Sequence, residues 1–135
     1  MMKLVNRIAR SRDGLGAAEF ALVCPVLFMA IIGVAQLGIL AFANAGLSNA
    51  VAEGARSLTV FPRPTDDQVK ARIADKKFGL EAAYLSAPVI TTGKSDNADF
   101  VEIKMDYTVP LNFVFFTGPT VKLTQTRRAF VYKTD

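Results

Sequence analysis

Residues 20–43, FALVCPVLFMAIIGVAQLGILAFA, form a run of 24 residues without a charge, in which Gln36 is the only strongly polar side chain. A helix of this length extends about 36 Å, which is longer than a bilayer hydrocarbon core of about 30 Å. The core helix of a small soluble domain would carry a polar stripe, and this run has none. The run therefore predicts one membrane-spanning helix.

The charges on either side of this run predict its orientation. Residues 1–14 carry four basic residues and one acidic residue, whereas residues 44–60 carry only Glu53 and Arg56. The positive-inside rule places the N-terminus in the cytoplasm and the bulk of the chain outside. Residues 44–135 are close to neutral, with 12 basic and 10 acidic residues. The net charge of +4 is mostly a topology signal, so we expect membrane lipid and no nucleic acid as a partner.

The helix is expected to continue beyond the membrane to about residue 58, because residues 43–58 are rich in helix formers and contain no proline. Pro25 removes one backbone hydrogen bond near the start and predicts a kink rather than a stop. Gly46, Ala50 and Gly54 recur every four residues on one face. Small residues at this spacing allow close helix packing, although an alanine-rich helix can also contain them without such a role.

A second helix is predicted after the two prolines of residues 61–65. Thr65 and Gln68 have the spacing of a capping box, which marks a helix N-terminus. Gly79 is a point at which this helix can divide into two pieces. The apolar residues expected on one face are Val69, Ile73, Leu80 and Tyr84.

The hydrophobic period then changes from 3.6 to 2. In DFVEIKMDYTVPL, residues 99–111, the side chains from 101 to 109 alternate strictly between apolar and polar, which predicts a half-buried strand over this stretch. Residues 87–92 are expected to pair with it across a loop at residues 93–98, and residues 121–133 to form a third strand. One or two helices packed on a three-stranded antiparallel sheet make a small α+β domain.

The chain is therefore expected to have three parts. Residues 1–14 form a basic leader, residues 15–60 a long apolar helix, and residues 61–135 the small outer α+β domain.

No catalytic constellation is present in the sequence. There is no histidine, the only cysteine is Cys24 within the apolar run, and no serine stands in a recognisable nucleophile setting. We predict no enzyme activity, no cofactor and no metal site. Phe113, Phe115 and Phe116 lie in a short connection bounded by prolines; they either fill the core or form an exposed contact patch.

The start of the apolar run carries a specific pattern, GLGAAEFALVCPVLF, in residues 14–28. It resembles the class III signal of type IV pilins, in which a basic leader ends at a glycine and a glutamate lies five residues further on. More closely, it is similar to the start of TadE-like proteins, the minor pilins or pseudopilins of the tight-adherence (Tad) pilus. Gly14, Glu19, Phe20 and Pro25 match the pattern of that family.

The resemblance implies that a prepilin peptidase cuts between Gly14 and Leu15, although Gly16 offers a second glycine. It also implies that Glu19 and Phe20 serve subunit assembly, with Glu19 pairing with the freed amine of a neighbouring subunit. Opposite charges attract far more strongly in low dielectric than in water, and their pairing offsets the desolvation of each. Alternatively, Glu19 lies at the lipid interface or caps the helix N-terminus.

The family further implies other pilin and minor pilin subunits and an inner-membrane assembly platform as partners. The expected function is to take part in Tad pilus assembly or initiation and so to support adhesion. The protein would lie in the bacterial inner membrane as a single-pass chain and could enter the extracellular pilus.

Two other classes stay open. An ordinary signal peptidase could cut after Ala43, because AFA at residues 41–43 has the required small residues. The apolar run is, however, longer than the usual 7–15 residues of a signal peptide. The other class is a single-span accessory subunit of an envelope complex that is never cleaved.

Overall fold

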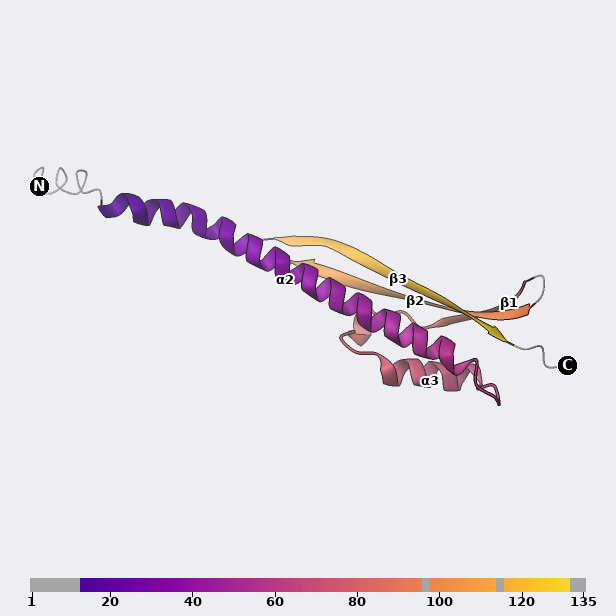
Figure 1. Ribbon diagram of the computed structural model, residues 1–135. Helices are drawn as coiled ribbons and strands as arrows, with labels where there is room; N and C mark the ends of the chain where they lie inside the picture. Colours follow the sequence, from indigo (N-terminus) through magenta and orange to yellow (C-terminus); the bar gives the residue numbers. More distant parts are fainter. Residues whose placement is uncertain (1–12, 96–97, 114–115, 132–135) are drawn as a thin grey trace, which may run out of the picture.

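The computed structural model describes the backbone of residues 13–95, 98–113 and 116–131, and side chains from residue 16 onward. A long helix is followed by a short helix, a 3-10 turn and three strands (Figure 1). This arrangement confirms the predicted α+β class. The elements are α2 (Asp13–Ser57), α3 (Asp66–Lys76), η1 (Ala82–Tyr84), β1 (Val89–Ser95), β2 (Ala98–Asn112) and β3 (Thr117–Val131).

Helix α2 has 45 residues and continues through Pro25 without interruption. Its N-terminal half projects beyond the rest of the molecule, whereas its C-terminal half lies along β2, β3 and α3 (Figure 1). The helix ends where expected, just before the prolines at residues 62 and 64. One continuous helix therefore joins an uncovered segment to a packed domain.

The three strands form an antiparallel sheet in the order β1–β2–β3. The predicted alternation is confirmed, because the odd-numbered residues of β2 from Val101 to Val109 are buried and the intervening residues are half-buried or exposed. The predicted central strand is confirmed, since β2 covers residues 99–111 with one more residue at each end. The predicted bounds of the two outer strands were wrong. β1 runs over residues 89–95, so pairing extends into the stretch predicted as a loop, and β3 begins at Thr117, four residues earlier than predicted. The alternation of apolar and polar residues does not mark polar stretches as strand. Polar residues such as Thr and Lys nevertheless pair with the neighbouring strand where one face of the sheet is exposed to water.

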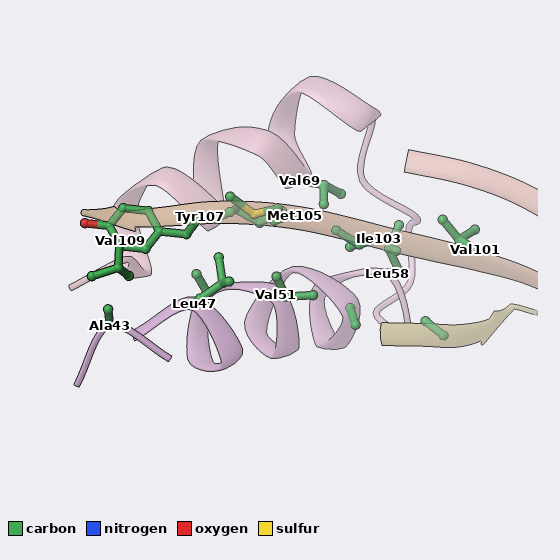
Figure 2. Packing of buried hydrophobic residues seen from close by; sticks show 14 residues of the cluster. Ala43, Leu47, Val51, Leu58, Val69, Val101, Ile103, Met105, Tyr107 and Val109 are labelled. Carbon is green, nitrogen blue, oxygen red and sulfur yellow. The ribbon is translucent and has the colours of Figure 1, made fainter. Parts of the chain in front are cut away.

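The core lies between the C-terminal half of α2, α3 and the inner face of the sheet (Figure 2). Leu47 and Val51 of α2 are fully buried and face Met105 and Ile103 of β2, which are 2% and 0% exposed. The sheet domain thus includes the end of α2 as one of its layers. The buried hydrophobic residues are Ala43, Leu47, Ala50, Val51, Ala55, Leu58, Val69, Ile73, Val101, Ile103, Met105, Tyr107, Val109 and Ala129.

Helix α3 begins with the predicted capping box. The Thr65 side chain accepts from the backbone N–H of Gln68, and the Gln68 side chain accepts from the backbone N–H of Thr65. The helix ends at Lys76, and only the short η1 follows, so the expectation of a helical face reaching Tyr84 was wrong. The chain leaves the helix at Lys77, whose backbone is extended. Gly79 follows in the loop with a φ of 63°, a left-handed conformation that residues with a side chain rarely adopt.

Candidate assembly site on the long helix

The N-terminal half of α2 is apolar and uncovered. Of the described residues, Gly16–Ser57 is the segment long and apolar enough to cross a membrane, and only 6% of its most apolar 18-residue window is buried. The core helix of a soluble protein would be mostly buried, so this exposure favours lipid or other helices as its surroundings. The exposed large side chains are Phe20, Leu22, Val23, Val26, Leu27, Phe28, Met29, Ile31, Val34, Leu37, Ile39 and Phe42.

The residues expected to serve processing and assembly lie at the start of this apolar surface. The backbone of Gly14 and Leu15 is already helical, while their side chains lie outside the described residues. Glu19 is exposed, and Phe20 is 67% exposed beside it. Four residues of helix rise about 6 Å, so an amine at Leu15 would lie roughly one turn from Glu19. The site therefore presents one carboxylate at the edge of an otherwise apolar rod.

The small-residue face of α2 packs within this chain. Gly46, Ala50 and Gly54 are all buried. A Cβ added to Gly46 would overlap the carbonyl oxygen of Phe78, and one added to Gly54 would lie 2.7 Å from Ile73 Cγ1. The α3 region therefore approaches the backbone of α2 closely at both glycines.

We expect Gly46→Ala to lower the stability of the sheet domain. The new methyl group meets backbone, which cannot rotate away, and overpacking of this kind costs roughly 1–3 kcal/mol. Gly33→Ala is the matched control, because no atom lies within 4 Å of the added Cβ. The control should be neutral or gain up to about 1 kcal/mol in helix propensity. Thermal unfolding in detergent, followed by circular dichroism of the sheet, measures both; equal melting temperatures would show that the contact tolerates a methyl group.

The β2–β3 hairpin reaches back along α2 into the apolar run. Gln36 Nε2 donates to the backbone carbonyl oxygen of Asn112 at 2.7 Å. Just beyond, the Phe113 N–H donates to the Phe116 carbonyl oxygen, and the two rings stack with centroids 4.8 Å apart. Phe113 is half-buried and Phe116 is 54% exposed, whereas Phe115 lies outside the described residues. The described rings are thus neither fully in the core nor fully exposed.

The face of the sheet opposite the core carries cross-strand ion pairs and, nearer one end, the aromatic pair Phe100 and Phe130. Asp106 Oδ1 accepts from Thr124 Oγ1 at 2.6 Å, and Lys122 Nζ lies 2.9 Å from Asp106 Oδ2. The hydrogen bonds from Thr124 and Lys122 lower the pKa of Asp106 below its ordinary value of 3.8. Asp106 therefore stays ionised at neutral pH. Glu102 and Arg128 form a second cross-strand ion pair.

Comparison with known protein families gives a match to the residues of α2. Residues 14–56 match the family model of TadE-like proteins. The match confirms the resemblance found in the sequence, and it includes Gly14, Glu19, Phe20 and Pro25. It covers the long helix almost to its end, and the sheet lies outside it. No curated protein and no solved structure matches the chain. The TadE-like match suggests a protein associated with the Tad pilus, in a family that is structural rather than catalytic.

Sequence reasoning missed the contact between Gln36 and Asn112. Two features of the sequence point toward it in retrospect. Gln36 is the lone strongly polar residue of the apolar run, and residues 107–121 contain no charge. A polar side chain in such a run needs a hydrogen-bond partner, and a charge-free hairpin is suited to lie beside apolar surface.

Proposed function

We propose that this chain is a TadE-like pseudopilin that a prepilin peptidase processes between Gly14 and Leu15. It takes part in the assembly or initiation of a Tad pilus and supports adhesion. Before assembly it lies in the inner membrane with its N-terminus in the cytoplasm and its sheet domain outside. Other pilin subunits and the inner-membrane assembly platform are its partners.

One observation carries this proposal: the apolar half of α2 is uncovered and begins at the Gly14–Glu19 pattern that the TadE-like model matches. Removal of the basic leader leaves 12 basic and 11 acidic residues. The helix then loses its cytoplasmic charge anchor. Such a helix can leave lipid and pack among like helices, which is the step that pilus assembly requires.

The packing of the domain argues against an ordinary signal peptide cut after Ala43. Ala43 is 1% exposed in the core, and Leu40 packs against the same cluster. Asn44, which would become the first residue, accepts a hydrogen bond from Gln125 Nε2 at 2.9 Å. A cut here would remove apolar residues from the core and place a charged amine beside it, which is costly.

Deletion of the gene for this chain is expected to abolish Tad pili and surface attachment, and a plasmid copy is expected to restore both. The full-length protein and its processed form should be recovered with the inner membrane. Electron microscopy of the cells, an attachment assay and immunoblots of membrane, sheared-pilus and medium fractions measure these outcomes. Normal pili in the deletion strain, or a soluble domain in the medium, would contradict the proposal.

A further inference from the structure

The end of the β2–β3 hairpin lies beside the part of α2 that is expected to cross the membrane. The hydrogen bond from Gln36 Nε2 to the Asn112 carbonyl oxygen fixes its level on the helix. In Figure 1, β2 and β3 run alongside α2 toward its N-terminal half, far from α3. The hairpin end is defined here as Leu111–Phe113 together with Phe116–Pro119.

The distance from Glu19 to Gln36 along α2 determines the depth of the hairpin end relative to the bilayer. Glu19 is the last charge before the run and is costly inside hydrocarbon, so it marks the cytoplasmic edge. Gln36 lies 17 residues further on, which is about 26 Å along a helix. A hydrocarbon core is about 30 Å thick, and any tilt shortens the height that the helix covers. With α2 across the membrane, the hairpin end is therefore at the outer edge of the hydrocarbon or just inside it.

The composition of the hairpin fits this level. No charged residue occurs from Tyr107 to Val121, and the first charges toward the domain are the paired Asp106 and Lys122. Asn112 lies six residue steps along the strand from Asp106, so the charge-free end is roughly 20 Å long. Phe116, which stacks on Phe113, is still 54% exposed at the far end.

The backbone of the hairpin end is also suited to a poorly hydrated position. Unpaired N–H and C=O groups are costly near lipid. Pro110 and Pro119 have no N–H, and the N–H of Phe113 is bonded to the Phe116 carbonyl oxygen at 3.0 Å. The Gln36 side chain supplies a donor to the carbonyl oxygen of Asn112. Several of the groups that would otherwise lose water are thus absent or paired.

We propose that the end of the β2–β3 hairpin is a second membrane contact, with Phe113 and Phe116 at the outer edge of the hydrocarbon, next to the headgroups of the outer leaflet, beside α2. The occupant of this surface is lipid. This position leaves the charged part of the sheet, which begins at Asp106 and Lys122, in water. The inference rests on the proposed membrane crossing of α2.

Single-tryptophan variants test this inference, because the sequence contains no tryptophan. The indole ring lies in the apolar run in Phe28→Trp and at the hairpin end in Phe116→Trp. In Phe130→Trp it lies on the sheet, far from the hairpin end. All three phenylalanines are more than half exposed, at 56%, 54% and 63%, so the larger ring has room. Each full-length variant is reconstituted in phosphatidylcholine vesicles with acyl chains brominated at a shallow or a deep position. Circular dichroism checks that each keeps the parent fold.

We expect deep bromines to quench the Phe28→Trp variant most, because its indole lies within the hydrocarbon. Shallow bromines should quench the Phe116→Trp variant at least about twofold more than the Phe130→Trp variant, because an indole ring at the hairpin end would lie at the outer edge of the hydrocarbon, next to the headgroups.

Three outcomes would overturn the inference, each in a different way. Quenching of Phe28→Trp, with Phe116→Trp and Phe130→Trp equally unquenched, would exclude the hairpin contact while leaving the membrane crossing intact. The Phe116→Trp emission could instead be blue-shifted without quenching by bromine, with a blue shift that grows as the protein concentration rises. This result would show that a neighbouring subunit, and not lipid, covers the hairpin end. Absence of quenching in Phe28→Trp would exclude the membrane crossing, and the hairpin contact with it.

Discussion

Replacement of Glu19 by glutamine is expected to leave membrane insertion and cleavage normal but to reduce incorporation into pili roughly tenfold or more. The substitution keeps the shape of the side chain and removes the charge that would meet the amine of a neighbouring subunit. Loss of one partner from a desolvated ion pair costs about 3–5 kcal/mol, because the other charge stays buried and unpaired. Insertion should tolerate the change, since a neutral amide is cheaper than a carboxylate near lipid.

The measurement is the ratio of processed protein in sheared pili to processed protein in the membrane. Glu53→Gln is the matched control, because Glu53 lies on the packed part of the same helix and pairs only at 4.0 Å with Arg56. This control should keep normal pili, since exposed pairs of this kind contribute at most about 1 kcal/mol. Unimpaired piliation and attachment with Glu19→Gln would exclude the pairing role and leave Glu19 as an interface or capping residue.

The long helix and the class of the fold could be predicted from the sequence because each depends on a local pattern. The charge-free run predicts α2, and the alternation of residues 101–109 predicts the central strand with its buried face. The capping box at Thr65 and Gln68 correctly places the start of α3. These patterns follow from backbone geometry and burial alone, so they need no knowledge of distant contacts.

The extent of the hairpin could not be predicted in this way, because it depends on residues far apart in the chain. Asn112 is held by Gln36, which lies 76 positions earlier. The hairpin also has an irregular register between Pro110 and Asn112, which breaks the simple alternation. The last residue of α3 is likewise held by a distant residue, because Asn49 Nδ2 of α2 donates to the Lys76 carbonyl oxygen at 3.2 Å. Non-local packing, rather than propensity, sets both boundaries.

The N-terminal residue of the mature protein tests the central claim most directly. A prepilin peptidase acting after Gly14 leaves Leu15 first and keeps the whole apolar part of α2 with Glu19 as the fifth residue. Cleavage after Gly16 would instead leave Glu19 third, and cleavage by a signal peptidase would leave Asn44 first.

Intact-mass spectrometry of the protein from cells that make the peptidase, with cells lacking the peptidase as the control, distinguishes these products. We predict a chain that begins at Leu15 in the first cells, with or without a methyl group on its amine, and an uncleaved leader in the second. A chain that begins at Asn44, or a leader that persists in the presence of the peptidase, would contradict the pseudopilin account.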